Sequence, residues 1–296
     1  MDSSKKLNLK NSAYKKAVEL YVWETYLDDV GKGDLTIKYF VAKKRKKIIA
    51  EVITNEDGII SGIQEAEWFL KKLGIKIIKG LKDGASIKSG QIIMKLKGTA
   101  QKILMAERTL LNLLQRMSGV ATATNKLSSK LPKSIKLLAT RKTLWGLLDK
   151  RAVTVGGGGT HRLNLNDAIL IKENHLSLSS DLKKDLRRAI KKSKKAKFIE
   201  IELENINEVM DFIMIYDQLK KEFTIKKQIV VMLDNFSPDT VKRAISLLKQ
   251  SKILIEISGS INEYNIDKYA IKGVSAISSG AVTMKASSLD ISLNFI

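Results

Sequence analysis

The chain has 296 residues, of which 44% are hydrophobic and 28% charged, an ordinary balance for a globular protein. It has no cysteine, which excludes disulfides, thiolate metal sites and cysteine nucleophiles. Lysine and arginine outnumber the acids 53 to 31, giving a net charge of +22. This charge suits nucleic acid, an anionic membrane or anionic small molecules as partners, and the alternative is that a biased base composition alone produces it. The longest uncharged stretch, residues 273–284, is too short to span a membrane, and the basic first residues precede no apolar core. We therefore expect a cytoplasmic protein.

Mixed α and β structure is predicted for the first hundred residues and a long helix after them. Apolar spacing and turn residues predict, in chain order, a helix at 14–27, a turn at 31–34, a strand at 47–54, a helix at 64–73 stopped by Gly74, strands at 76–79 and 86–98, and a helix from 100 to about 130.

Short apolar runs alternate with helical segments after Pro132. Strands are predicted at 135–139, 168–171, 198–203, 229–233, 253–257 and 274–277, and helices at 181–196, 207–222, 238–250 and 263–271. This alternation predicts parallel pairing with crossover helices. We favour an α/β barrel over a doubly wound sheet, because no early strand precedes a nucleotide-binding glycine fingerprint.

Polar groups follow each of the six apolar runs, at the edge where barrel enzymes build their active sites. The cations are Arg141, Lys142, Arg162 and Lys172, and they predict a ligand with more than one acidic group. The chain's two histidines, His161 and His175, are too few for a histidine-only zinc site.

Three glutamates, Glu200, Glu202 and Glu204, alternate with apolar residues and so share one strand face. We expect this face to point into the barrel, where with Asp234 it would hold Mg²⁺ or the hydroxyls of a sugar. An exposed strand face or a structural ion pair is the alternative.

Glycine-bearing turns at Ser258-Gly259-Ser260 and Ser279-Gly280, with a helix beginning after residue 262, predict a phosphate seat. The tetraglycine at 156–159 lacks the G-K-[ST] of a P-loop, and we expect it to permit close backbone approach.

The chain resembles the quinolinate phosphoribosyltransferases over nearly its whole length. The shared motifs, in the family's order, are GDLT at 33–36, AERTLLNLLQRMSG at 106–119, TRKT at 140–143, VGGGGTHRLNLNDAILIKENH at 155–175, IEIELEN at 199–205, MLDN at 232–235, ISGSI at 257–261, ISSGAVT at 277–283 and LDISL at 289–293. The resemblance implies an N-terminal α/β sandwich at 1–115, joined by the tail 284–296, and an incomplete barrel of about six strands at 116–283. It also implies a Mg²⁺-dependent reaction of quinolinate with phosphoribosyl pyrophosphate (PRPP), giving nicotinate mononucleotide, pyrophosphate and CO₂ in NAD biosynthesis.

The resemblance further implies roles for individual residues. Arg141, His161, Arg162 and Lys172 match residues around the quinolinate carboxylates, and Arg108 matches an arginine contributed by the partner subunit of a homodimer. Lys142 matches a lysine near the donor pyrophosphate. Glu202 and Asp234 match the acids near the ribose and Mg²⁺. The residues matching the 5′-phosphate region are Ser258, Gly259, Ser260, Ser279 and Gly280.

Three departures from the family pattern stand out. Leu144-Trp145-Gly146 replaces the common T-P-G, Met284 stands where a histidine is common, and the span from Glu202 to Asp234 is longer, with a lysine-rich middle that predicts a longer surface helix or loop.

Other activities remain as alternatives. A group of proteins linked to molybdenum transport resembles the same family with another acceptor, and nicotinate phosphoribosyltransferase uses a mono-acid acceptor. Retention of the full set of acceptor-carboxylate residues favours quinolinate. Basic clusters at 183–197 and 43–47 raise nucleic-acid binding as a different class, but no nucleic-acid motif accompanies them and neither has the aromatic face of a membrane anchor. We therefore expect no nucleic-acid or membrane partner.

Overall fold

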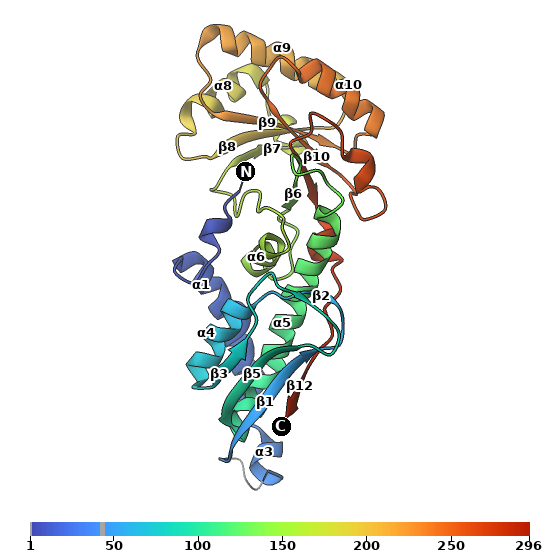
Figure 1. The fold of residues 1–296 in the computed structure, drawn as a ribbon. Coiled ribbons are helices and arrows are strands. Elements are labelled where there is room, and N and C mark those ends of the chain that lie inside the picture. Colours follow the sequence, from blue (N-terminus) through green and yellow to red (C-terminus); the bar gives the residue numbers. More distant parts are fainter. Residues whose placement is uncertain (1, 42–44) are drawn as a thin grey trace. The chain divides into compact units, whose positions relative to one another are not determined.

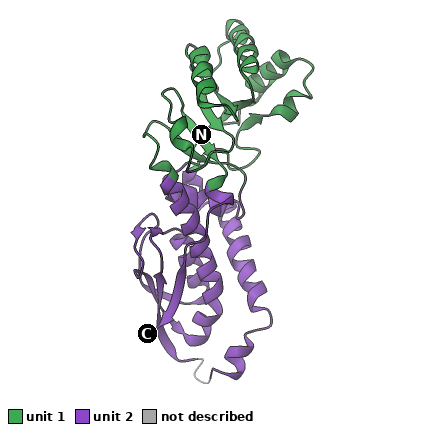
Figure 2. Cartoon of the chain, turned by 90° about the vertical axis from the view of Figure 1, so that its right-hand side faces the viewer, with its two compact units in different colours: residues 1–3, 127–142, 159–281 green, residues 4–126, 143–158, 282–296 purple. Residues whose placement is uncertain are grey.

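A computed structural model describes residues 2–41 and 45–296, which divide into two compact units (Figure 2). Unit 1 comprises residues 1–3, 127–142 and 159–281, and unit 2 comprises residues 4–126, 143–158 and 282–296. The domain boundary predicted between residues 115 and 116 falls inside helix α5 (Ala100–Ser128). Among the described residues, no helix has both the length and the apolar character that crossing a membrane requires.

Unit 1 is built on a parallel sheet of six strands in the order β6-β11-β10-β9-β8-β7 (Figure 1). The strands are β6 (Lys136–Ala139), β7 (Ile169–Ile171), β8 (Phe198–Leu203), β9 (Gln228–Asp234), β10 (Leu254–Ser258) and β11 (Ala276–Ser279). All six lie where the apolar runs predict strands, and β8 is buried at every residue, as a strand covered on both faces must be. The prediction of an incomplete six-stranded α/β barrel is confirmed.

Helices α8 (Leu182–Lys192), α9 (Ile206–Glu222) and α10 (Pro238–Leu248) lie side by side along one face of this sheet (Figure 1). Each begins at a residue whose side chain accepts a backbone N–H of the first turn: Asp181, Asn205 and Ser237. These caps fix where each crossover leaves the carboxyl end of its strand. Helix α9 runs to Glu222, so the lysine-rich stretch between β8 and β9 lies at the end of this helix and in the loop that follows it.

The helix predicted at 263–271 is wrong, because only the 3₁₀ turn η3 (Ile266–Tyr269) forms there. Asn262 and Asn265 explain the difference. The Asn265 side chain accepts the N–H of Asn262 at 2.8 Å, and the Asn262 side chain accepts the N–H of Tyr264 at 2.9 Å. Such local bonds compete with a helix, and the helix dipole predicted for a phosphate at this point is absent among the described residues.

Unit 2 contains an antiparallel sheet in the order β12-β1-β5-β3, with the long helix α5 beside it (Figures 1 and 2). Its strands are β1 (Lys47–Thr54), β3 (Lys76–Gly80), β5 (Ile92–Thr99) and β12 (Ile291–Phe295), and a separate pair joins β2 (Gly58–Ile59) to β4 (Ser86–Ile87). Strand β12 brings the end of the chain against β1, so residues more than 200 positions apart in sequence share one sheet.

The helices of unit 2 include a segment that the sequence predicts as one continuous helix at 14–27. There the chain forms α1 (Ser12–Val18), the π-helical turn η2 (Glu19–Glu24) and α2 (Thr25–Val30). Besides α5, the described part of unit 2 includes η1 (Ser4–Lys6), α3 (Leu35–Tyr39), α4 (Ile63–Leu73) and α6 (Leu147–Val155). Helix α4 stops at Gly74 as predicted, and Gly74 adopts the left-handed conformation. In unit 1 the four-residue helix α7 (Glu173–Leu176) follows β7, and the four-residue helix α11 (Ala281–Met284) follows β11 where the chain passes from unit 1 to unit 2.

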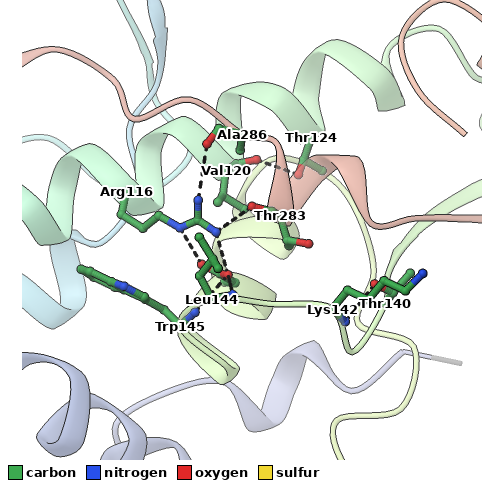
Figure 3. Close-up of polar contacts among 10 residues, drawn as sticks. Arg116, Val120, Thr124, Thr140, Lys142, Leu144, Trp145, Thr283 and Ala286 are labelled. Atoms are coloured by element: carbon green, nitrogen blue, oxygen red, sulfur yellow. Dashed lines mark hydrogen bonds and ion pairs between the residues drawn. The ribbon is translucent and has the colours of Figure 1, made fainter. Parts of the chain in front are cut away.

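The segment Leu144-Trp145-Gly146 is held by a buried ion pair within unit 2. Asp149 accepts the backbone N–H of Leu144 at 2.8 Å and that of Trp145 at 3.2 Å, and Arg116 binds its two carboxylate oxygens at 3.0 and 2.8 Å. Arg116 also donates to the carbonyl oxygens of Thr283 and Ala286 (Figure 3). One arginine thus joins α5, the 144–146 segment, α11 and the chain just after α11.

Candidate active site

A pocket of about 480 Å³ opens at the carboxyl ends of the unit 1 strands. Because parallel strands end at the same edge of a sheet, side chains far apart in sequence meet there. Its lining includes eight residues predicted as site residues: Arg141, Lys142, His161, Arg162, Lys172, Glu202, Asp234 and Ser258.

The predicted cations lie on this pocket at different depths. Arg141 and Lys142 are exposed just after β6, whereas Arg162 is buried and Lys172 half-buried. Burial, with the nearby positive charge of Arg141, lowers the pKa of the Arg162 guanidinium from its usual value. Lys172 Nζ lies 2.5 Å from Glu202 Oε2, so one cation of the pocket is already paired with a carboxylate of the next strand.

Three carboxylates gather at the ends of β8 and β9. One oxygen each from Glu202, Glu204 and Asp234 lies within 4.8 Å of the others. Glu202 is buried as predicted, whereas Glu204 is exposed although its carboxylate reaches the predicted cluster. Strand β8 ends at Leu203, and Glu204 is exposed because the chain turns there into α9, where its N–H donates to Glu208.

A second cluster lies deeper and joins His161 to two buried acids. His161 Nε2 is 2.7 Å from Glu200 Oε2 and 3.6 Å from Glu256 Oε2. Burial raises the pKa of both carboxyl groups to about 8, and for Glu256 the neighbouring charge of Glu200 adds to the rise. At neutral pH the carboxyl groups of Glu200 and Glu256 are therefore largely protonated and uncharged.

The residues predicted for the phosphate seat divide between pocket lining and scaffold. Ser258 lines the pocket. The Ser279 hydroxyl donates to the carbonyl oxygen of Ile261 at 2.6 Å, so it braces the turn that carries Gly259 and Ser260. Gly259 has φ +97°, and a Cβ there would meet Asn235 Oδ1 at 2.3 Å. Gly280 lies beside Lys142, and a Cβ added at Gly280 would lie 3.4 Å from Lys142 Cδ.

Two further predicted features lie outside this pocket's lining. Arg108 is exposed on α5, in unit 2. The tetraglycine does permit close approach, as predicted: Gly159 bonds with its N–H and C=O to β6, and a Cβ there would meet Leu138 at 2.7 Å.

Sequence reasoning missed Glu256 and Ser278, both of which line the pocket. Glu256 stands between two isoleucines in a predicted strand. The alternation that predicts inward-facing glutamates on β8 applies equally to β10, and this signal identifies Glu256.

The basic cluster at 183–197 is partly neutralised within unit 1. Lys183 and Arg187 pair with Glu222 of α9, and Lys197 pairs with Asp167. This pairing suits a solvated helix face better than a nucleic-acid stripe. In the second basic cluster, at 43–47, residues 43 and 44 lie outside the described part of the chain.

An open parallel barrel whose carboxyl edge gathers cations and carboxylates in one pocket has the architecture of an enzyme that acts on anionic sugar phosphates. Comparison with known proteins identifies which one. Residues 34–118 match the N-terminal domain model of quinolinate phosphoribosyl transferase, and residues 120–294 match the C-terminal domain model. The chain belongs to the quinolinate phosphoribosyl transferase family.

Individual relatives agree with this assignment. A probable nicotinate-nucleotide pyrophosphorylase (carboxylating) of Methanocaldococcus jannaschii is 37% identical over 90% of this chain and 93% of its own, and one of Methanothermobacter thermautotrophicus is 33% identical over 90% and 94%. The structure of the nicotinate-nucleotide pyrophosphorylase from Francisella tularensis superimposes with a TM-score of 0.83 at 36% identity, covering 95% of this chain and 96% of that one. The prediction of a phosphoribosyltransferase is confirmed.

Proposed function

We propose that the unit 1 pocket carries out the reaction for which the relatives are named. It transfers the phosphoribosyl group of PRPP to the ring nitrogen of quinolinate, and the 2-carboxylate leaves as CO₂. The products are nicotinate mononucleotide and pyrophosphate, a step of NAD synthesis. The observation that carries the proposal is the meeting of a cation set and a carboxylate set in one pocket, with Lys172 and Glu202 in contact between them.

The acceptor side of the pocket suits a dianion. Arg141, Arg162 and Lys172 offer three positive charges, and arginine forks match carboxylates in two parallel hydrogen bonds. His161 also lines the pocket, and its Nδ1 accepts the backbone N–H of Arg162, so we assign it to the same subsite. A mono-acid such as nicotinate would leave part of this positive charge unpaired, which favours quinolinate as the acceptor.

The donor side suits a sugar that becomes cationic. Departure of pyrophosphate leaves positive charge on the ribose ring, and a fixed carboxylate such as Glu202 stabilises that charge. Asp234 binds the ribose hydroxyls, and Lys142 faces the pyrophosphate. The 5′-phosphate is received by the turns at Ser258–Ser260 and Ser279–Gly280. The pyridine nitrogen is itself the nucleophile, so the protein need not supply one.

Decarboxylation uses the charge that transfer has created. Once the ring nitrogen carries the ribosyl group it is positive, and loss of the 2-carboxylate leaves an electron pair on the adjacent carbon. The ring charge and the surrounding cations stabilise that pair until the carbon takes up a proton.

Mg²⁺ fits the carboxylate cluster on the donor side. Glu202, Glu204 and Asp234 present hard oxygen donors within 4.8 Å of one another, and such oxygens bind Mg²⁺ together with substrate phosphates. A bound ion would neutralise the leaving pyrophosphate. Lys172 shares the Glu202 carboxylate with this cluster, so the side chain has an alternative partner when no cation is present.

A homodimer with a shared site completes the proposal. Arg108 is exposed on α5, where the partner subunit's pocket can use it as a further cation for the acceptor carboxylates. Unit 2 also exposes apolar side chains along its N-terminal helical segment, among them Leu20, Leu35, Tyr39 and Phe40, as an assembling surface does. We place the enzyme in the cytoplasm, because both substrates are strongly charged metabolites that do not diffuse across membranes.

The test is an assay with PRPP, quinolinate and Mg²⁺ that follows nicotinate mononucleotide by mass and CO₂ by release of label. Both products should form, and E202A should abolish both. R243A, which removes an exposed cation of α10 outside the pocket, should behave as wild type. Transfer to nicotinate or another acceptor without CO₂ release would contradict the acceptor assignment and leave the phosphoribosyl site standing.

A further inference from the structure

His161 adopts a backbone conformation that histidine rarely takes. Its φ is +50°, and its side chain is only 7% exposed. A non-glycine residue in this left-handed region costs free energy unless its surroundings hold it there. The next residue is Arg162, one of the cations proposed to bind the acceptor.

The ring of His161 is held at both nitrogens by the protein itself. Nδ1 accepts the backbone N–H of Arg162 at 2.7 Å, so Nδ1 carries no proton. Nε2 must then carry it, and Nε2 lies 2.7 Å from Glu200 Oε2. Phe198 packs edge-on against the imidazole ring, with 5.4 Å between the ring centroids and 87° between the ring planes. Glu200 thereby fixes both the ring orientation and the tautomer that accepts from Arg162.

The backbone on either side of Arg162 is fixed in the same way. The Thr160 hydroxyl donates to the carbonyl oxygen of His161 at 2.9 Å, and Asp167 accepts the N–H of Leu163 at 3.2 Å. The Arg162 side chain is itself braced, since Nη1 donates to the carbonyl oxygen of Ala168 at 3.4 Å. The guanidinium thus lines the pocket from a segment with little freedom to move.

We propose that Glu200, acting through His161, is a positioning residue that aims Arg162 at a carboxylate of the acceptor. His161 serves the acceptor subsite by shaping the chain before Arg162 rather than by donating to substrate, because both its ring nitrogens already have partners. The proposal rests on the proposed function, in which Arg162 binds quinolinate. It adds a buried glutamate with no direct substrate contact to the residues that determine acceptor affinity.

Kinetics of the purified protein provide the first test. E200L removes the oxygen that accepts the Nε2 proton and replaces it with an apolar side chain of similar volume. We expect KM for quinolinate to rise about tenfold, with KM for PRPP within about threefold of wild type. E200Q retains an oxygen that accepts from Nε2 and should recover most of the loss. E65L is the matched control: Glu65 is equally buried and accepts the Tyr14 hydroxyl at 2.7 Å, but it lies in unit 2. Its loss should lower the melting temperature without separating the two KM values.

A double-variant experiment distinguishes positioning from general damage. If Glu200 acts through Arg162, E200L should raise KM for quinolinate less than twofold when added to R162A. A further tenfold rise in the R162A background would overturn the proposal, as would an equal rise in both KM values. If E200L does not fold, H161N makes the same test from the other end of the contact, because asparagine tolerates positive φ but cannot bridge Arg162 to Glu200.

The histidine tautomer can be read without any activity. The chain has two histidines, so ¹⁵N spectra of the imidazole rings contain two sets of signals, and H175Q assigns them. We expect His161 to show a protonated Nε2 and an unprotonated Nδ1 in wild type and E200Q, and a mixture in E200L. A protonated Nδ1 in wild type would overturn the proposal even if the enzyme uses quinolinate. The expected tautomer in a protein that does not use quinolinate would instead count against the proposed function.

Discussion

Lys172 Nζ contacts Glu202 Oε2 at 2.5 Å, so a cation predicted to bind the acceptor is paired with the carboxylate predicted to face the donor sugar. Lys172 follows β7 and Glu202 is the last residue but one of β8, and these strands are neighbours in the sheet. The pair joins the two halves of the pocket.

The first prediction separates the acceptor side of the pocket from the donor side. Replacing Lys172 or Arg141 with alanine removes a charge-assisted contact to the acceptor, and such contacts contribute about 1.5–3 kcal/mol. We expect KM for quinolinate to rise at least about tenfold while KM for PRPP changes by less than about threefold. Steady-state kinetics with each substrate varied in turn measure both. Equal losses for the two substrates would contradict the assignment of these residues to the acceptor.

The second prediction tests the shared site. R108A and E202A subunits should each be inactive alone, because each lacks one part of every site. Random mixing in a symmetric dimer leaves one intact site in half of the dimers, so about a quarter of wild-type activity should return. Co-purification through two different tags establishes that mixed dimers form. Inactive mixed dimers would show that Arg108 does not act across the interface.

These predictions show which parts of the site the sequence discloses. Lys172 and Asp234 are recognisable because each follows an apolar run, and Glu202 because it alternates with apolar residues. Parallel strands bring such positions to one edge of the sheet. The contacts between these side chains cannot be recognised from the sequence, because nothing in the spacing of Lys172 and Glu202 indicates that the two side chains meet. Glu256 carries the same alternation signal as Glu200 but stands alone on its strand, without the repeat that makes Glu200, Glu202 and Glu204 conspicuous.

The fold also contains elements that the sequence predicts and elements that it does not predict. Strands β8 and β9 follow from buried apolar runs, whereas the helix at 263–271 fails because asparagine side chains bind nearby backbone groups, a competition that apolar periodicity does not register. The pairing of β12 with β1 depends on a contact between opposite ends of the chain, which local sequence cannot specify.

The third prediction concerns pH and the buried acid Glu256. Its pKa is raised by burial to about 8, against about 4.5 for an exposed glutamate. Between these values the folded state holds a proton that the unfolded state has lost, so the free energy of unfolding falls as pH rises, by about 1.4 kcal/mol per pH unit for one such group. E256Q removes this titration. Its melting temperature should therefore fall less between pH 5 and 8 than that of wild type, as measured by calorimetry. Parallel curves for the two proteins would show that Glu256 ionises normally in the fold.

The fourth prediction concerns the ion pair that holds the 144–146 segment. D149A leaves the buried guanidinium of Arg116 without its carboxylate, and breaking a buried pair from one side costs about 3–5 kcal/mol. D217A breaks the exposed pair of Asp217 with Lys220 on α9 and should cost less than about 1 kcal/mol. Denaturant unfolding at one pH compares the two. Similar losses would mean that Arg116 finds other partners when Asp149 is removed.

The fifth prediction uses two glycines to separate backbone strain from close approach. Gly90 has φ +79° with no atom within 4 Å of an added Cβ, whereas Gly259 has φ +97° and a Cβ there would collide with Asn235. G90A should therefore cost only the conformational strain, about 1–2 kcal/mol, and G259A should cost that strain together with displacement of the Asn235 backbone. Because Asn235 follows Asp234, the displacement should also raise KM for PRPP, a change that G90A should not produce. Unfolding curves and donor kinetics on the two variants make the comparison. A G259A protein that loses no more stability than G90A and keeps its PRPP affinity would show that the turn after β10 shifts freely and does not hold the donor phosphate in place.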